Sequence, residues 1–571
     1  MNKYIPILML GILASPTFAA NYTATVDGNF TNPETWGETE LIPTAEDSFT
    51  IGSGITVDIT SAVVANKIEY AHNYQNPGIL NITGEDASLT LSSYSSLFYQ
   101  YMMVFNVSEG ANLDAKFSWG GGGYYKMNID AATATLALDQ FQGSKFDGDE
   151  TLDSGIYLTN GAVATSASNW NLNPSSADHS VTVSVDNSKL QMSASNWLTI
   201  NTSGSNSQAN IYVKNNGVVN NLGSFTTSGE NSVANIEIEN STATQSGSTF
   251  QATGQNSTLN FTVKESSYAL SGDFKMLADA TDATLNLSFI DNASPISISY
   301  MYVGARNGGT VNFAMKNSEI NTNNFYIGQH EYNLNSNVYN NGLTNISLYN
   351  SKMTFTQFKV NYWDNSTTTI ALSGNSKMVQ SSGSTINFGT RDGEKNGGEV
   401  ILQLGDYVDG NFVAAQAGAF QGSYEFFATS TSTLKFLLGA ENFTKTGEET
   451  QGALISATYF KPVQGEIILD FSNVIGLEEG YYTVALIACT SKQSMESLNG
   501  LTASYNDLFE QNVIETDIVK LFYDDNGDCY TIKDGVLYAN IEVLNIIPEP
   551  GTYAAIFGAL ALAFAAYRRR K

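Results

Sequence analysis

Positively charged residues are scarce in this sequence. Lys and Arg number 26 against 55 Asp and Glu, so the 571-residue chain carries a formal net charge of −29 at pH 7. Phosphate binding requires clustered cations and the basic residues form no patch along the body, so we expect no nucleic-acid partner. Charged residues make up only 14% and hydrophobic residues 42%, which is too apolar for a disordered chain and unusually uncharged for a compact enzyme.

Cysteine and histidine are also rare. The two cysteines, Cys489 and Cys529, stand in no metal-ligand spacing, and in an exported chain they form either one disulfide or two buried thiols. The three histidines, His72, His179 and His330, are separated by more than a hundred residues each, which is too far for one shared zinc shell on a short-coiled repeat. We therefore expect solvated loop histidines, no metal site and no cofactor.

Motifs for catalysis or ion binding are absent or incomplete. Asp524–Asp528 suggests a calcium loop, but its glycine stands one place early and no bidentate Glu follows. We interpret Asn526-Gly527 as a hairpin turn, with weak calcium binding as the alternative. Asp147–Glu150 is an acidic cluster of a kind that polysaccharide-cleaving β-helices use, yet an acid pair alone is nonspecific. Gly120–Gly123 lacks the Lys-Ser/Thr of a phosphate loop, so we expect no catalytic residue and no enzyme.

Asn, Ser, Thr and Gly fill the polar positions instead, and they recur with a period. An asparagine between apolar residues repeats at steps of 25, 25, 26 and 26 residues, at Asn210, Asn235, Asn260, Asn286 and Asn312. Five and six residues after each anchor comes a pair typical of turns, such as Asn240-Ser241 or Asn317-Ser318. A short alternating strand followed by a turn at a fixed period indicates a solenoid.

The repeat predicts an all-β chain whose residues 20–445 form a right-handed parallel β-helix with coils of about 25 residues. Weaker matches place its start near residue 45, which gives about fifteen coils. Asn32–Trp36 and Ile42–Asp47 are interpreted as an N-terminal cap, because solenoids need protection against end-to-end pairing. The periodic asparagines are interpreted as a structural ladder, and a ladder for a ligand or ion is the alternative.

The period fades after residue 445. Longer apolar strands are expected over residues 465–471 and 481–487. We interpret residues 446–547 as a small β-sandwich-like cap, with its boundary in the polar stretch before residue 451.

The N-terminal residues have the pattern of a secretory signal peptide. Lys3 opens a short basic region, Ile5–Leu13 is an apolar run, and small residues precede Ala19. The run is far shorter than the roughly 20 residues that span a bilayer. We expect residues 1–19 to direct export through the secretion translocase and signal peptidase to cut between Ala19 and Ala20.

The C-terminal residues 548–571 consist of three parts in a fixed order. Pro548-Glu549-Pro550 comes first, the uncharged apolar run Tyr553–Tyr567 follows, and Arg568, Arg569, Arg570 and Lys571 end the sequence. The run would form a membrane helix of about 22 Å, shorter than the roughly 30 Å hydrocarbon core. The basic tail favours the cytoplasmic side and acts as a stop-transfer segment, while the two prolines keep the Glu549 segment extended.

These three parts resemble the PEP-CTERM sorting signal of Gram-negative bacteria, and the repeat resembles autotransporter-like β-helices. The resemblance implies that an exosortase recognises Pro548, Glu549 and Pro550 and cleaves nearby, so that residues 553–567 anchor the chain in the inner membrane only transiently. It implies delivery of the body to the cell surface, the outer envelope or the extracellular matrix.

The leading hypothesis is a noncatalytic surface or matrix structural protein, with exopolysaccharide as a candidate partner. Export, the repeat and the missing catalytic motifs motivate it. The alternative is a secreted polysaccharide-binding or polysaccharide-degrading β-helix, because the 30 tyrosines offer rings on which sugars stack. Exposed aromatics or paired carboxylates along a groove would favour that alternative.

Overall fold

The computed structural model describes most of the chain between residues 19 and 544. The described ranges are 19–69, 76–96, 102–118, 124–138, 140–141, 144–145, 154–328, 340–360, 365–383, 386–388, 398–423, 425–428, 431–460, 465–489 and 512–544. Within these ranges the regular elements are β-strands and two short 3-10 helices, η1 (Pro33–Trp36) and η2 (Ala440–Asn442). No helix found in these ranges is long and apolar enough to cross a membrane.

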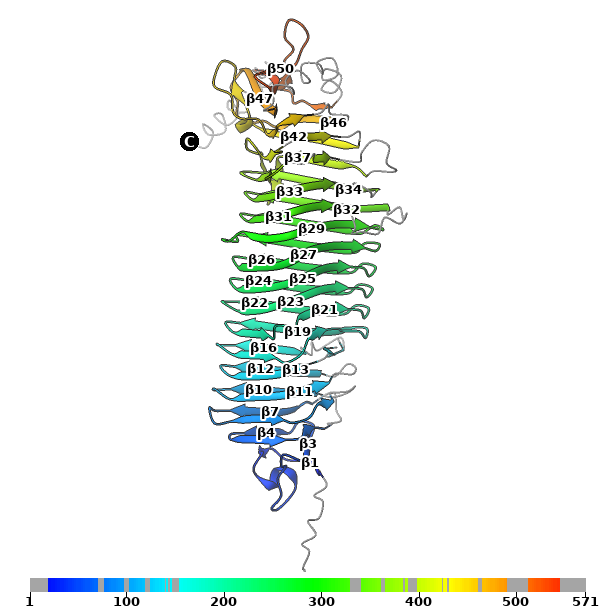
Figure 1. The fold of residues 1–571 in the computed structure, drawn as a ribbon, viewed down its shortest axis with the longest axis vertical. Helices are drawn as coiled ribbons and strands as arrows, with labels where there is room; N and C mark the ends of the chain where they lie inside the picture. Colours follow the sequence, from blue (N-terminus) through cyan, green and yellow to red (C-terminus); the bar gives the residue numbers. More distant parts are fainter. Residues whose placement is uncertain are drawn as a thin grey trace, which may run out of the picture. The chain divides into compact units, whose positions relative to one another are not determined.

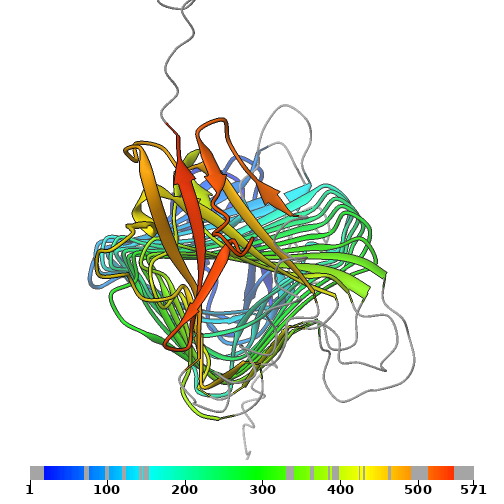
Figure 2. The ribbon, with the colours of Figure 1, turned by 90° about the horizontal axis from the view of Figure 1, so that it is seen from above.

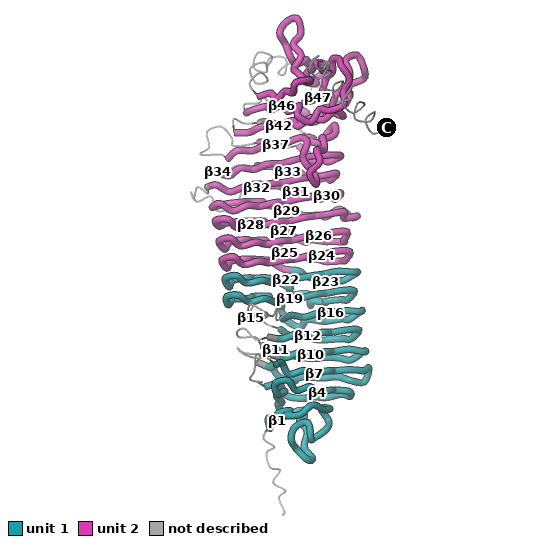
Figure 3. The backbone as a smooth tube through the Cα atoms, turned by 180° about the vertical axis from the view of Figure 1, so that it is seen from behind, with its two compact units in different colours: residues 1–222 teal, residues 223–571 magenta. Residues whose placement is uncertain are grey.

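The chain divides into two compact units, residues 1–222 and 223–571 (Figure 3). Both consist of parallel β-coils, and the strands within each unit stack in sequence order (Figure 1). The parallel β-solenoid predicted from the repeat is confirmed, with coils of about 26 residues.

In unit 1 each coil contributes a strand to each of two parallel sheets. The first sheet contains β2 (Gly28–Asn29), β4 (Thr56–Ile59), β7 (Gly78–Thr83), β10 (Met102–Ser108), β12 (Tyr124–Asp130), β16 (Gly155–Thr159), β19 (His179–Asp186) and β22 (Gln208–Lys214), with β15 (Ser144–Lys145) antiparallel to β19. The second contains β5 (Ala62–Ala65), β8 (Ser88–Leu91), β9 (Ser95–Ser96), β11 (Asn112–Ser118), β13 (Thr133–Leu138), β14 (Gln140–Phe141), β17 (Val163–Ser166), β18 (Trp170–Leu172), β20 (Lys189–Met192) and β21 (Leu198–Thr202). Strand β23 (Val218–Thr227) contains the boundary between the units.

Unit 2 repeats the arrangement with longer strands. Its first sheet contains β24 (Val233–Glu239), β26 (Thr258–Lys264), β28 (Thr284–Ile290), β30 (Thr310–Lys316), β32 (Asn340–Tyr349), β34 (Asn365–Ser373), β37 (Val400–Leu404), β42 (Ser432–Gly439), β46 (Glu466–Asn473) and β48 (Val513–Ile514). The second contains β25 (Thr242–Ala252), β27 (Ser267–Asp279), β29 (Ile296–Arg306), β31 (Glu319–Ile327), β33 (Lys352–Val360), β35 (Lys377–Gln380), β36 (Ile386–Phe388), β40 (Phe420–Gln421), β41 (Glu425–Ala428), β44 (Ile455–Ala457) and β45 (Tyr459–Phe460).

The strands form because apolar and polar residues alternate. In β26, Leu259, Phe261 and Val263 are buried, while Thr258 and the intervening residues face outward. Strands β24, β26, β28 and β30 of successive coils pair without a register shift, so each of their inward side chains lies against its equivalent in the next coil. Phenylalanine rings of unit 2 stack in this way with centroids 4.7 to 6.3 Å apart, at Phe225, Phe250, Phe261, Phe274, Phe289 and Phe313.

The predicted turn residues end the first-sheet strands in the left-handed conformation. In unit 2 the φ angles are 46° at Asn240, 54° at Asp291 and 48° at Asn317, and short polar side chains tolerate this region best after glycine. The next residue is buried, and its side chain caps a backbone amide of the preceding coil: Oγ of Ser266 accepts from the amide of Ser241 at 3.1 Å, for example. The turn therefore fixes the coil length and satisfies a buried amide.

The first coil of unit 1 is covered by a separate segment. A three-stranded parallel sheet of β1 (Asn21–Ala24), β3 (Ser48–Ile51) and β6 (Lys67–Ile68) stands beside η1. Trp36 of η1 is 4% exposed, packs edge-on against Phe30 and Phe49, and donates its indole N–H to the carbonyl of Phe30 at 2.8 Å.

The C-terminal part of unit 2 differs from the predicted cap. Strand β46 continues the parallel coils, since Thr433 of β42 pairs with Glu466, so the coils run beyond residue 445. The remainder is a mixed sheet of β43 (Thr444–Lys445), β47 (Gly480–Cys489), β49 (Val519–Leu521), β50 (Tyr530–Lys533) and β51 (Val536–Val543). Strand β47 pairs in parallel with β44, so this sheet continues the second coil sheet, and its strands are orange and red in Figure 2.

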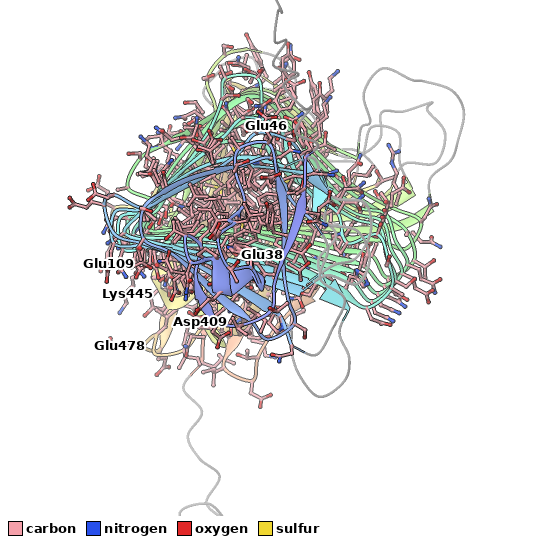
Figure 4. All side chains as sticks on the ribbon, turned by 90° about the horizontal axis from the view of Figure 1, so that it is seen from below. Glu38, Glu46, Glu109, Asp409, Lys445 and Glu478 are labelled. Atoms are coloured by element: carbon pink, nitrogen blue, oxygen red, sulfur yellow. The ribbon has the colours of Figure 1, made fainter. Side chains whose placement is uncertain are left out.

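One hairpin of unit 2 lies outside the coil sheets. Strands β38 (Asp406–Val408) and β39 (Asn411–Val413) pair antiparallel, and Asp409 at their turn lies 3.4 Å from Nζ of Lys316. Asp409, Lys445 and Glu478 lie at the outer surface of this unit (Figure 4). Because the Asp409 side chain is 81% exposed, solvent screens this ion pair and it adds little stability.

Candidate functional site

The outer face of the second sheet of unit 2 carries a column of long polar and aromatic side chains. Lys275 of β27 pairs with Tyr302 of β29, Tyr302 with Tyr326 of β31, and Tyr326 with Lys359 of β33. All four are half-buried, because each stands at an outward position between buried neighbours. Four successive coils thus place two tyrosines between two lysines on one face, which we call the tyrosine face.

The rings of the tyrosine face form a continuous surface. Tyr300 is 40% exposed and stacks on Tyr302, with centroids 6.2 Å apart and planes 9° apart. Tyr302 and Tyr326 follow at 5.5 Å with a tilt of 53°. Nζ of Lys359 lies 5.3 Å from the Tyr326 centroid, and the Tyr326 hydroxyl donates to Oε1 of Gln357 at 2.8 Å. These contacts hold the rings in place before any ligand binds.

A depression of about 230 Å³ adjoins the rings. Gly304 forms part of its lining, opposite Leu277 in the sheet, and the absence of a side chain there keeps the surface open. Arg306, 5% exposed, contributes the guanidinium group. The remaining lining is Thr249, Gln251, Lys275, Met276, Tyr302, Val303 and Gly328. Rings beside amide, hydroxyl and cationic groups are suited to a polar ligand with an apolar face.

A second depression, of about 550 Å³, lies on the preceding segment of the same strands. Its lining is mostly hydroxyl and amide side chains: Ser271, Ser297, Ser299, Asn321, Thr322, Asn323, Thr354, Thr356 and Ser381, with Leu270, Gly272 and Ile298. Neutral donors and acceptors on a repeating sheet match a polyhydroxylated chain better than a compact charged ligand.

The asparagines singled out by the repeat form hydrogen-bonded ladders. In unit 2 the Nδ2 of each asparagine donates to the Oδ1 of the one before it at 2.8 to 2.9 Å, along Asn235, Asn260, Asn286, Asn312 and Asn345. In unit 1, Asn128, Asn106, Asn81 and Asp58 form a shorter ladder. Both amide groups of an internal asparagine are used within the ladder, which supports the structural interpretation over a ligand site.

The two cysteines lie in the mixed sheet of unit 2 and are buried, at 4% and 1% exposure. The amide of Cys489 donates to Gly535, whereas the carbonyl of Cys529 accepts from Asn540. Both partners belong to the segment of β51 and its turn, five residues or about 17 Å apart along an antiparallel strand. A disulfide needs Cα atoms within about 7 Å, so a Cys489–Cys529 disulfide would require a different register from this one.

The acidic loop Asp524–Asp528 forms the predicted tight turn, closed by hydrogen bonds from the Asp524 amide to the Asp528 carbonyl and from the Gly527 amide to the Asp524 carbonyl, each at 2.9 Å. Strands β49 and β50, on either side of it, both pair with β51, at Leu521↔Ile541 and Tyr530↔Ala539, so they continue along one edge rather than pairing with each other. The carboxylate of Asp524 accepts the amides of Asn526 and Asp528 at 2.8 and 2.9 Å. Those backbone hydrogen bonds lower the pKa of Asp524. The amides of the loop itself therefore satisfy this carboxylate.

The histidine expectation is wrong for His179, which is 7% exposed at the start of β19 and pairs with Lys145 of β15. Within the ranges described for the chain, no group of three His, Cys, Asp or Glu side chains is placed to hold a metal ion.

Ala19 and Ala20 precede β1, where the Ala20 amide donates to Oδ1 of Asp47 at 2.7 Å.

Several predicted features lie outside the described residues. They are His72, His330, Gly120–Gly123, Asp147–Glu150, the sorting motif Pro548, Glu549 and Pro550, the apolar run 553–567, and Arg568, Arg569, Arg570 and Lys571.

Sequence reasoning missed the tyrosine face, although a signal was present: tyrosines at outward positions of strands one coil apart, at Tyr302 and Tyr326. The fold is an all-β parallel solenoid, and the tyrosine face is an aromatic surface on one of its sheets. No family model matches the chain, and neither the curated proteins nor the solved structures contain a match.

Proposed function

We propose that this protein is an exported structural protein of the bacterial cell surface or extracellular matrix, sorted and cut at its C-terminal signal by an exosortase. The observation that carries the proposal is the coincidence of Pro548-Glu549-Pro550, an uncharged run of 15 residues and a tail of four basic residues, in that order. Each part has a physical role in membrane insertion and orientation.

The solenoid supports a structural role. Its ladders consume the polar groups that repeat from coil to coil, so periodic side chains contribute to stability rather than to chemistry. The excess of acidic residues keeps such a chain soluble outside the membrane. Coils that are stabilised at each repeat suit a protein whose function is structural.

Replacing Pro548, Glu549 and Pro550 with alanine tests the sorting step. In the protein's own host we expect the variant to remain in the inner-membrane fraction at full length, while the parent chain leaves that fraction. Thr552→Ala, which changes the same segment outside the motif, should be processed like the parent. Equal release of parent and triple-alanine chains would overturn the proposal.

A second candidate, polysaccharide binding, is favoured by the tyrosine face. Three rings in contact, flanked by Lys275 and Lys359 and by depressions rich in hydroxyl and amide groups, provide stacking and hydrogen-bonding partners for a sugar chain. The two lysines favour a glycan that carries carboxylate or sulfate groups. The same face would attach the exported protein to exopolysaccharide, so this candidate extends the structural role.

Titration with acidic and neutral polysaccharides tests this candidate. We expect Tyr302→Ala to weaken binding of an acidic glycan by about tenfold or more, which corresponds to at least about 1.4 kcal/mol. Tyr94→Ala removes an exposed tyrosine from unit 1, 48% exposed and outside the face, and should leave affinity unchanged. Equal affinities of the two variants would exclude the tyrosine face as the binding site.

A further inference from the structure

The backbone amide of Ala20 is directed at a carboxylate that is already enclosed. Asp47 is 8% exposed. Its Oδ1 accepts the Ala20 amide at 2.7 Å, and its Oδ2 accepts the amide and hydroxyl of Thr44 at 3.0 and 2.6 Å. The Ala20 carbonyl in turn accepts the amide of Ser48 at 2.9 Å. The two backbone polar groups of Ala20 are thus bound to the last residue before β3 and to the first residue of β3.

This residue is also the one that follows the expected signal-peptide cleavage site. Hydrolysis of the Ala19–Ala20 bond by signal peptidase adds water, so that Ala19 gains a carboxylate and the nitrogen of Ala20 becomes an amine that is protonated at neutral pH. The nitrogen that carries the new charge is the atom already 2.7 Å from Asp47.

We propose that removal of the signal peptide creates an ion pair between the α-ammonium of Ala20 and the carboxylate of Asp47, which fixes strand β1 on the first coil of the mature protein. The proposal rests on the proposed export. Before cleavage the contact is an amide–carboxylate hydrogen bond; afterwards it joins two opposite charges, which is a stronger interaction in an enclosed site.

The surroundings of Asp47 favour its charged form. Burial alone raises the pKa of this carboxyl, but hydrogen bonds from Thr44 and from the Ala20 amide outweigh burial and leave its pKa below the ordinary value. A carboxylate that stays ionised is available for the ammonium group over a wide pH range.

Strand β1 is the edge strand of its sheet, so the contact at Ala20 adds to a pairing on one side only. It pairs with β3 alone in the parallel sheet, through Asn21↔Ser48 to Ala24↔Ile51. Ala20 is the residue immediately before that pairing begins. A charge pair at this position therefore secures the outermost strand at the end where fraying would start.

Other charged and titratable groups near the contact do not replace Asp47. Glu46 is the neighbouring residue and is exposed; Glu46 and Glu38 are labelled in Figure 4, which views unit 1 from its N-terminal side. Tyr22 of β1 has a pKa raised by burial and by Asp47 and Glu38. Lys67 of β6 is paired with Glu69.

The α-amino pKa tests the proposal on the full chain produced with Ala20 as its first residue. It can be measured by competitive acetylation across a pH series, with mass spectrometry of the N-terminal peptide. We expect a pKa about one unit above the usual 7.7–8.0, so that labelling below about pH 7 is about tenfold slower than in the unfolded chain. Asp47→Asn should return the pKa to the usual range, whereas Glu46→Gln removes an equal charge and should not.

A second measurement covers the case in which Asp47→Asn disturbs folding. In the Asp47 parent, Nα-acetylation of Ala20 removes the charge alone, and we expect faster hydrogen exchange in residues 21–24 with no change in unit 2. An ordinary α-amino pKa in the parent, or identical exchange with and without the acetyl group, would overturn the ion pair. Because the chain is produced directly from Ala20, these results do not depend on export. The proposed export is contradicted by a different observation, namely a host protein that does not begin at Ala20.

Discussion

Replacing Asn286 tests whether the ladder of unit 2 stabilises the coils. Its Nδ2 donates to Asn260 and its Oδ1 accepts from Asn312, each at 2.8 Å. A buried or half-buried hydrogen bond contributes about 0.5–1.5 kcal/mol net. Asn286→Ala removes two and should therefore cost about 1–3 kcal/mol of local stability.

Hydrogen exchange measures that cost locally, which matters because a long repeat need not unfold in one step. At about 1.4 kcal/mol per tenfold change, amides of β26, β28 and β30 should exchange about 5- to 150-fold faster in Asn286→Ala. Asn323→Ala is the matched control, since Asn323 is an exposed asparagine of β31 outside the ladder.

Asn286→Asp adds a pH dependence with a defined sign. The ionised carboxylate still accepts from Asn312 but faces Oδ1 of Asn260 with no proton between them, so folding raises its pKa. The protonated acid restores the donor, so the variant should match the parent below the unfolded pKa of about 3.9 and lose stability as pH rises through the folded value. Equal protection in parent, Asn286→Ala and Asn286→Asp at pH 7 would refute the ladder as a stabilising element.

Three further results are expected. Phe261→Ala should cost about 3–5 kcal/mol, because Phe261 is buried against four aromatic rings; hydrogen exchange of unit 2 compared with Thr262→Ala measures it. Burial raises the pKa of Tyr268, whose hydroxyl donates to Gln245. The stability present below about pH 10 should therefore fall as the pH rises through the pKa that Tyr268 has in the folded chain. Alkaline unfolding of Tyr268→Phe should begin at higher pH than that of the parent. Asn317→Val should cost about 1–2 kcal/mol because φ is 48° there, whereas Asn317→Gly should be nearly neutral. Thermal unfolding of the two variants measures the difference.

The coils could be predicted because their determinants are local and repeat. Asn286 and Asn312 follow one another at a coil's spacing, and Asn317 marks a turn whose conformation few residues adopt.

The features that failed depend on partners distant in sequence. The loop at Asp524 forms the predicted turn, but β49 and β50 on either side of it both pair with β51, which follows them. Strand β46 resembles a cap strand by length, yet its partner is β42. The tyrosine face likewise arises only when four coils come into register, so no single segment such as the one around Tyr302 indicates it.

Mass spectrometry of the mature protein from its own host tests the central claim of export and sorting most directly. We expect a chain that begins at Ala20 and lacks Arg568, Arg569, Arg570 and Lys571, with its C-terminus near Pro548-Glu549-Pro550. A mature species that retains Met1 or the four basic residues would contradict it.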